Sequence, residues 1–315
     1  MFADLHCDTV TRAFDEGCEL RENLLHIDLK RRQNAGGGIQ NFALFLNAKK
    51  LHEKGEDIFK KARLYLEFYK QQIKENEDIV MPAGSFREIK RCLSKGKLAA
   101  VLTLEEGAVC KGEIENLRFF YQNGVRMMTL TWNYSNELAA ACGEKEDYGL
   151  TYLGVQFVGE MEKLGMIVDV SHLSDKGIYM MGEIAKKPFV ASHSNARMVC
   201  PHRRNLTDEM IHIIADKGGV IGLNFYEEFL CPGFRNLSLK EQRVSLAQHV
   251  KHIQNVGGEE VLAIGSDFDG IDTNPLLPEV SVIPDTREML HGEGISWRVL
   301  DKMYFGNVMR VYGEM

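Results

Sequence analysis

Residues that could carry out chemistry stand where apolar segments of the chain end. The first such segment, ADLHCDTV over residues 3–10, carries His6 and Asp8 two positions apart. Alternate residues of a strand share one face, so these two side chains are expected to point the same way. Ionisable groups on one face of a buried strand are costly unless a partner compensates them. Since imidazole and carboxylate are ligands for zinc and related divalent ions, the spacing indicates a metal site.

Four further apolar segments end in the same kinds of residue. They lead into Glu105 and Glu106, into His172, into His193 and into Asp267. Such a set exceeds what one tetrahedral zinc ion with an open position would use. Two ions bridged by one carboxylate, with a water held between them, would use all of it. Asp4 is expected on the face of His6, either orienting a ligand or forming a paired acid in the interior.

The elements that must position these residues are short apolar segments separated by helical patterns. Such near-continuous apolar segments are typical of strands in a parallel sheet covered on both faces. The alternation predicts a (β/α)8 barrel, the TIM barrel, with a doubly wound sheet as the alternative. In a barrel the carboxyl ends of the strands meet at one face, where the active site lies. The eight expected strands cover residues 2–9, 38–47, 97–107, 124–132, 165–172, 188–193, 218–226 and 260–270.

The 315 residues show no linker and no low-complexity segment, so we expect one barrel domain over residues 1–315. Residues 270–295 hold three of the seven prolines and are expected to form a long loop over the mouth of the barrel. The composition is that of an ordinary globular protein, with 44% hydrophobic and 26% charged residues.

Several functional classes are disfavoured by the sequence. The net charge is −7 and no basic stripe is present, so nucleic acid is not an expected partner. The apolar start is too short for a signal peptide or a membrane span, and seven scattered cysteines suit a reducing compartment. These features predict a cytoplasmic protein without a membrane partner. The sequence also lacks the H-E-x-x-H, G-x-S-x-G, P-loop and G-x-G-x-x-G motifs.

Taken in order, the polar motifs resemble those of the membrane (renal) dipeptidase family, a branch of the metal-dependent amidohydrolase-like barrels. The resemblance runs from about residue 2 to the C-terminal FGNVMRVYGEM. It rests on H-x-D in the first segment, EG after the third, SH after the fifth, SHSNAR and RRN after the sixth, NFY on the seventh and GSDFDG on the eighth.

The resemblance implies a zinc-dependent dipeptidase that hydrolyses a peptide bond through a hydroxide bridging two Zn²⁺ ions. It assigns His6 and Asp8 to one ion, His172 and His193 to the other, and Glu106 to the bridge. Glu105 is the less expected bridge, because the family places Gly directly after the bridging acid. The resemblance also implies cleavage of L,L-dipeptides, tolerance of a D-residue at the C-terminal position, and a homodimer.

Substrate contacts are implied in the same way. Arg204, in HRRNL, matches the arginine that receives the substrate carboxylate, and Asp267 matches the acid that meets the amino group and shuttles protons. Tyr226, in NFY, is expected at the substrate. Trp132 stands where the family often has a histidine that polarises the scissile carbonyl. An indole donates one hydrogen bond and carries no charge. Either Trp132 shapes the pocket and a metal alone polarises the carbonyl, or the activity is weaker or redirected.

Two other functional classes remain open at this point. One is a different metal-dependent amide or lactone hydrolase on the same binuclear centre, which would not require both free termini. The other is a non-catalytic relative of the barrel, for which Trp132 is the one hint. The preferred dipeptides and the metal bound in the cell are not determined by the sequence.

Overall fold

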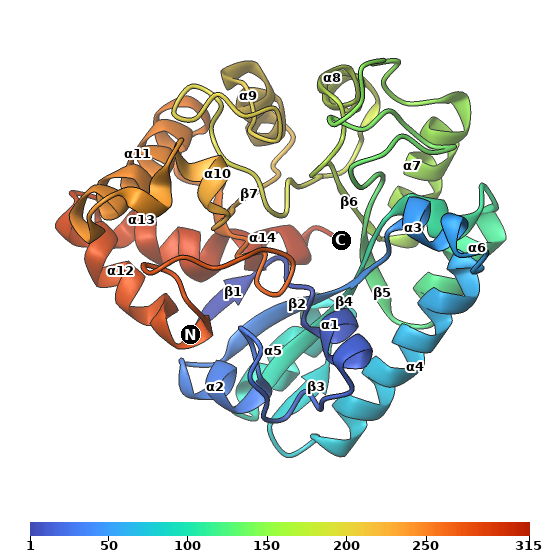
Figure 1. Ribbon diagram of the computed structural model, residues 1–315, viewed down its shortest axis with the longest axis horizontal. Coiled ribbons are helices and arrows are strands. Elements are labelled where there is room, and N and C mark those ends of the chain that lie inside the picture. Colours follow the sequence, from blue (N-terminus) through green and yellow to red (C-terminus); the bar gives the residue numbers. More distant parts are fainter.

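The computed structural model describes all 315 residues, and its centre is a curled parallel sheet surrounded by helices (Figure 1). Every pair of neighbouring strands is parallel, and the strand order is β6-β5-β4-β2-β1-β8-β7. The strands are β1 (Phe2–Asp4), β2 (Gly38–Phe45), β4 (Leu98–Glu105), β5 (Val125–Thr129), β6 (Ile167–Asp169), β7 (Ile221–Leu223) and β8 (Leu262–Ile264).

The segment expected as the sixth strand, residues 188–193, joins the two ends of this sheet. Val190 forms a parallel bridge with Asp169 of β6, and Ala191 forms one with Ile221 of β7. The Val190 amide donates to Val168 and the Ala191 amide donates to Val220, each at 3.0 Å. The sheet therefore closes into a barrel with eight strand positions. The barrel prediction is confirmed, and the doubly wound alternative is wrong because that sheet would keep two open edges.

One strand was not expected from the sequence. β3 (Val80–Pro82) pairs with Leu98–Ala100 at the start of β4, before the pairing of β4 with β5 begins at Leu102. Its three residues include a proline, which weakens any strand signal in the sequence.

The helices begin mostly at side-chain caps of the kinds that the sequence indicates. Asp57 caps α4, Thr207 caps α9, and Ser238 forms a capping box with Glu241 at the start of α11. The helices are α1 (Thr9–Glu16), α2 (Leu29–Asn34), α3 (Ala48–Glu53), α4 (Ile58–Glu75), α5 (Phe86–Ser94), α6 (Ile114–Gln122), α7 (Tyr152–Leu164), α8 (Asp175–Ile184), α9 (Asp208–Asp216), α10 (Glu227–Leu230), α11 (Leu239–Gly257), α12 (Ile283–Gly292), α13 (Trp297–Asp301) and α14 (Asn307–Gly313). None of them combines the length and apolarity needed to cross a membrane.

Residues 270–295 are only partly the loop that the sequence indicated. Their first half is irregular, but Val280–Val282 forms a short 3₁₀ turn that leads directly into α12. Pro284 lies in the first turn of that helix, where its missing N–H costs nothing. The prolines therefore mark a helix start as well as a loop.

Candidate active site

The residues singled out in the sequence lie at the carboxyl ends of the barrel strands, although these ends are up to 261 positions apart in the chain. β1 ends at Asp4, and His6 and Asp8 stand in the segment between β1 and α1, where Cys7 still forms a parallel bridge with Phe268. Glu105 is the last residue of β4, and His172 follows β6. The others are His193, after the segment that closes the barrel, and Asp267, after β8.

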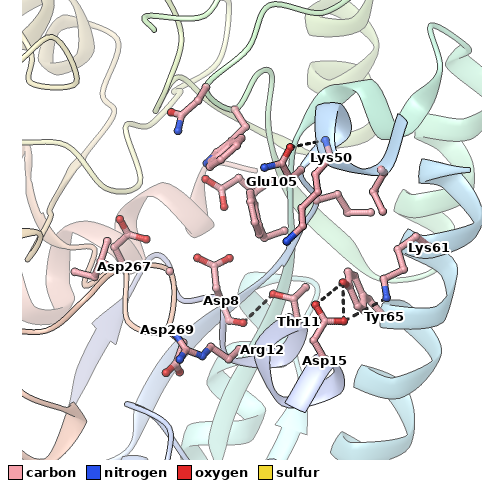
Figure 2. Close-up of a pocket in the computed structure, with 18 of the residues that line it drawn as sticks. Asp8, Thr11, Arg12, Asp15, Lys50, Lys61, Tyr65, Glu105, Asp267 and Asp269 are labelled. Carbon is pink, nitrogen blue, oxygen red and sulfur yellow. Dashed lines mark hydrogen bonds and ion pairs between the residues drawn. The ribbon is translucent and has the colours of Figure 1, made fainter. Parts of the chain in front are cut away.

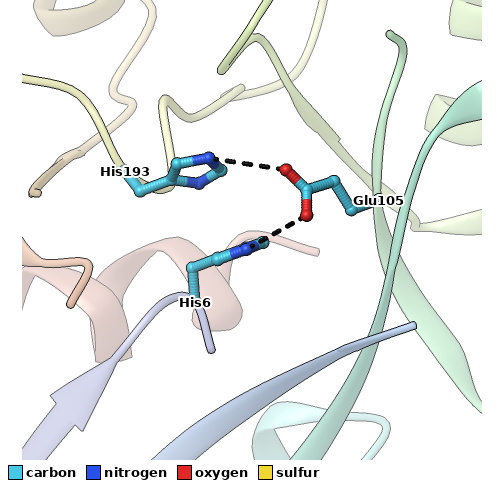
Figure 3. A group of neighbouring side chains, drawn as sticks. All are labelled: His6, Glu105 and His193. Atoms are coloured by element: carbon cyan, nitrogen blue, oxygen red, sulfur yellow. Dashed lines mark ion pairs between the residues drawn. The ribbon is translucent and has the colours of Figure 1, made fainter. Parts of the chain in front are cut away.

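The carboxylate of Glu105 lies between three imidazoles. Its Oε2 is 3.3 Å from Nε2 of His6, while its Oε1 is 3.1 Å from Nε2 of His172 and 3.6 Å from Nε2 of His193. Figure 3 shows Glu105 reaching from β4 toward His6 and His193, each of which comes from a different part of the barrel. Asp8 adds a second carboxylate, with Oδ2 3.5 Å from Nε2 of His6.

This geometry corrects the expectation for Glu106. The chain turns sharply there, with a φ of 109°, and the Glu106 carboxylate accepts hydrogen bonds from the Ala108 amide at 2.9 Å and the Asn136 side chain at 2.6 Å. Consecutive residues at a strand end point to opposite faces, so only one of the two glutamates can reach the histidines. Gly107 is required for close packing, because a Cβ there would lie 2.5 Å from the Leu130 oxygen. The expectation for Glu106 rested on the glycine that follows it, but Gly107 is explained by this packing and gives no evidence about which acid bridges the metal ions.

The hydrogen bonds around two of the histidines define which ring nitrogens are free. Nδ1 of His172 lies 2.8 Å from the Asn133 amide oxygen, which only accepts, so this nitrogen carries the proton. Nδ1 of His193 lies 2.7 Å from the Ser192 hydroxyl, which itself donates to Asp169 at 2.6 Å. In both rings Nε2 is therefore left with a lone pair.

These two lone pairs face one another, with the Nε2 atoms of His172 and His193 3.0 Å apart. Two acceptors at that distance repel, whereas a cation would be bound by both. Burial holds the pKa of each histidine well below its usual value, so both rings stay neutral, as metal ligands must be. The arrangement fits a metal site.

His6 supports the same conclusion. Neither of its ring nitrogens has a hydrogen-bond partner although the side chain is buried, and Oδ1 of Asp8 also lacks one. Buried polar atoms are almost always satisfied, so several orphans in one place indicate a missing partner. Burial opposes protonation of His6, but Glu105 and then Asp8 outweigh it and raise its pKa. Burial likewise raises the pKa of Glu105, and a bound cation would relieve both conflicts.

Backbone strain gathers at the same place. Three residues here have backbone φ values in the left-handed region, which residues other than glycine rarely adopt. They are His172 at 70°, Asp267 at 61° and Asp269 at 69°. Such residues cluster at functional sites, where the surrounding structure holds them in position.

The histidine cluster opens into a cavity of about 690 Å³. Arg204 lines it and is 7% exposed, yet no carboxylate lies within 4 Å of its guanidinium. Its two terminal nitrogens make only long contacts, at 3.5 Å to the Ser194 hydroxyl and 3.3 Å to the His193 carbonyl, and its Nε has no partner. A buried cation without a counterion is costly, and an anionic group of a ligand would compensate it.

Asp267 lines the same cavity, on the side of His6. Its Oδ2 accepts from the Asn224 amide at 2.9 Å, and its Oδ1 lies 3.9 Å from Nε2 of His6. Burial raises the pKa of this carboxyl to about 6, although His6 opposes the rise. A carboxyl with a pKa near neutrality is suited to accept and return a proton.

Comparison with known proteins identifies the family. Residues 1–315 match the membrane dipeptidase family (peptidase family M19). The chain belongs to this family. It is therefore a metal-dependent peptidase that acts on dipeptides.

Relatives of this dipeptidase occur in bacteria, fungi and mammals. An uncharacterised Klebsiella pneumoniae protein from the pqqA 5′ region is 35% identical over 233 residues, which cover 72% of this chain and 86% of that protein. Dipeptidase aclJ of Aspergillus oryzae is 29% identical over 97% of this chain and 75% of its own length. Mouse dipeptidase 3 is 33% identical over 70% of this chain, but the match spans only 45% of the mouse protein.

Solved structures show the same fold. A Rhodobacter sphaeroides metallopeptidase, solved with a phosphinate mimic of the dipeptide L-Ala-D-Ala, superposes with a TM-score of 0.89. The two chains are 22% identical, and the match covers 99% of this chain and 98% of the other. At this identity the likeness concerns the fold.

Trp132 and Tyr226 were also predicted to contact the substrate, and only one of them lines the cavity of the dipeptidase. Trp132 lines the cavity, with its ring 4.9 Å from Phe45 and 6.3 Å from His172. Tyr226 does not line it. The wall is formed there by Phe229, against which the Tyr226 ring packs edge-on at 4.9 Å. Phe229, on α10 directly after NFY, therefore takes the wall position expected for Tyr226, and the substrate contact of Tyr226 stays a prediction.

Two aspartates near the site serve the fold of the dipeptidase. Asp4 accepts from the Ser266 amide at 2.8 Å, the Ser266 hydroxyl at 2.7 Å and Gln40 at 3.0 Å, and it contacts His6 only at the backbone nitrogen. Of its two open roles, the structure favours the buried interior acid, whose partners are hydrogen-bond donors of Ser266 and Gln40. Asp269 accepts hydrogen bonds from the Thr9 hydroxyl and the His26 amide.

Proposed function

We propose that this dipeptidase hydrolyses dipeptides with free amino and carboxyl termini, using two zinc ions. The observation that carries the proposal is the pair of buried charges at one cavity. Arg204, on the side of His172 and His193, has no counterion, and Asp267 faces the same cavity beside His6. A dipeptide with both termini free offers one partner to each.

The ligands proposed for the metal centre are those that the geometry brings together. We propose that His6 and Asp8 would hold one ion, His172 and His193 the other, and that Glu105 would contribute a carboxylate oxygen to each. Three imidazoles with carboxylates form a donor set typical of zinc. When bound, a pair of such ions supplies a water that ionises near neutral pH and a Lewis acid for the carbonyl oxygen.

The protein groups orient the substrate and move protons. The guanidinium of Arg204 binds the terminal carboxylate as a fork, which a lysine could not reproduce. The Asp267 carboxylate binds the substrate ammonium, accepts a proton from the attacking water and passes that proton to the amine that leaves. Trp132 and Phe229 form apolar walls that exclude water from the scissile bond. A peptide longer than two residues cannot place both of its charges on these groups.

The C-terminal residue of the substrate is proposed to be of either configuration. This part rests on the similar R. sphaeroides metallopeptidase, whose bound phosphinate mimics a dipeptide ending in D-Ala. The cytoplasmic location and the homodimer stay predictions. The absence of disulfides among the seven cysteines supports a reducing compartment.

The test is amino-acid release from L-Ala-L-Ala and L-Ala-D-Ala, each also as the N-acetyl and C-terminal amide form, with and without a chelator. Chelator-sensitive cleavage that is strongest for the free dipeptides is expected. Equal cleavage of the blocked forms would instead show a general amide hydrolase. No cleavage by zinc-loaded protein would favour a non-catalytic relative of the barrel.

Variants separate the substrate roles from structural ones. Asp267→Asn should lower kcat/KM for the free dipeptide more than for its N-acetyl form, while the zinc content stays at that of the wild type. Asp269→Asn is the control, since that carboxylate is engaged by Thr9 and His26. Loss of zinc from Asp267→Asn would show that the residue belongs to the metal centre.

A further inference from the structure

The catalytic cavity extends well beyond the histidine cluster. Its outer part is lined by residues of α1, α3 and α4 and of the loop between α3 and α4. Most of these residues are charged, and they have no role in the reaction proposed above. The charged residues are Arg12, Asp15 and Glu16 from α1, Lys50 and Lys54 from α3 and its C-cap, Glu56 from the loop and Lys61 from α4, and Tyr65 of α4 lies beside them.

Most of these charges are paired within the protein. Nε of Arg12 lies 2.8 Å from Glu16, and Nζ of Lys61 lies 3.2 Å from Asp15. The Tyr65 hydroxyl donates to the same aspartate at 3.0 Å. These groups are matched to one another and offer little to a ligand.

Lys50 differs from them. It has no carboxylate within 4 Å, and Figure 2 shows its side chain extending from α3 across the cavity, between Glu105 and Thr11. Its backbone is held in place, because its amide donates to Asn47, the N-cap of α3, at 2.9 Å. Lys54, one helical turn further along, is also unpaired. The unpaired groups of the outer cavity are thus two lysines and the carboxylate of Glu56, which leaves one positive charge in excess.

The strand order shows which end of a substrate lies nearest to Lys50. β8, β1 and β2 are neighbours in the barrel, and they lead into Asp267, α1 and α3 respectively. Arg204 follows the closing segment between β6 and β7, on the other side of the barrel. Since Asp267 is proposed to hold the substrate ammonium, the side chain of the N-terminal residue has the outer cavity before it.

We propose that Lys50 makes this dipeptidase selective for dipeptides whose N-terminal residue has an acidic side chain, glutamate or aspartate. The inference rests on the proposed function, because it takes the substrate orientation from Asp267 and Arg204. The ammonium of Lys50 pairs with the side-chain carboxylate, and Lys54 adds to the positive potential. Glu56, the remaining unpaired carboxylate of the outer wall, lies near Tyr65.

The test compares two substrates of nearly equal shape, L-Glu-L-Ala and L-Gln-L-Ala. The ratio of their kcat/KM values isolates the side-chain charge. A partly exposed ion pair predicts a preference of roughly fivefold for the glutamate substrate, decreasing as salt is added. Lys50→Met should bring the ratio close to one, and Lys50→Glu should invert it.

The control is Lys49→Met. It removes the same charge from the same helix, but Lys49 does not line the cavity and its Nζ lies 4.9 Å from the Tyr134 ring. This variant should keep the wild-type ratio, so an equal change in both variants would overturn the proposal.

Other outcomes are also decisive. Equal turnover of the two substrates by the wild type, or a preference for L-Lys-L-Ala, would refute the role of Lys50 and leave the dipeptidase function standing. Failure of the zinc-loaded wild type to cleave any free dipeptide would overturn both proposals.

Discussion

Replacing Arg204 by methionine should weaken catalysis and strengthen the fold. The guanidinium is 7% exposed, has no carboxylate partner, and makes two contacts at 3.3 and 3.5 Å, near the limit for hydrogen bonds. The folded protein without substrate therefore carries a nearly unsolvated positive charge. Methionine keeps the unbranched apolar stem but removes the charge, together with the guanidinium carbon that lies 5.5 Å from the centroid of the Phe229 ring.

The effects on catalysis and on stability follow from two states of the Arg204 charge, which is paired when substrate is bound and unpaired when it is not. A hydrogen-bonded pair with a substrate carboxylate is worth about 2 kcal/mol, so Arg204→Met should lower kcat/KM for L-Ala-L-Ala roughly thirtyfold. The C-terminal amide has no carboxylate, and its turnover should change much less. Relief of the unpaired charge should raise the free energy of unfolding by about 1 kcal/mol, or the melting temperature by roughly 2 °C.

The assay is a cycle of two proteins and two substrates, with thermal unfolding of the zinc-loaded proteins measured beside it. Arg203→Met is the matched control, because the neighbouring arginine is exposed and donates to the Gly143 carbonyl at 2.9 Å. It should change neither the substrate ratio nor the melting temperature appreciably. An equal loss with the dipeptide and its amide, or a lower melting temperature for Arg204→Met, would refute the reasoning.

Three further predictions test the site and its support. Glu105→Gln should lower zinc affinity, measured by competition with a chromogenic chelator, at least a hundredfold, whereas Glu106→Gln should leave it nearly unchanged; the reverse result would restore Glu106 as the bridge. Ser192→Ala removes the partner of a ligand imidazole and should weaken zinc binding about tenfold, and unchanged affinity would contradict that role. Burial lowers the pKa of His249 to about 4, although its hydrogen bond to the Leu230 carbonyl opposes this shift. Between pH 6.5 and pH 4 only the unfolded chain therefore takes up the proton, so the free energy of unfolding decreases as the pH is lowered. This costs the wild type about 3 kcal/mol across that range in urea unfolding; His249→Gln should lack this component, and equal slopes would contradict it.

The sequence alone determined the barrel and the chemical type of the site. Alternating apolar segments and capped helices are local signals, because each depends on residues within a few positions of one another. Since the strands of a barrel are parallel, His6, His172, His193 and Asp267 had to meet once each was placed at a strand end. The roles expected for Arg204 and Asp267 could also be inferred without the tertiary structure, because the sequence motifs around them carry the resemblance to the family.

Only the tertiary structure decided which of two adjacent side chains faces the site. Glu105 and Glu106 are chemically identical, and the register of β4 with its neighbours turns the first toward the histidines. The same holds for Phe229, which takes the place expected for Tyr226, since the course of α10 is not a local property of NFY. The tautomers of the ligand histidines and the unpaired state of Lys50 depend on partners distant in sequence. Orientation at a strand end and the pairing of charges are set by contacts between elements, which no local pattern encodes.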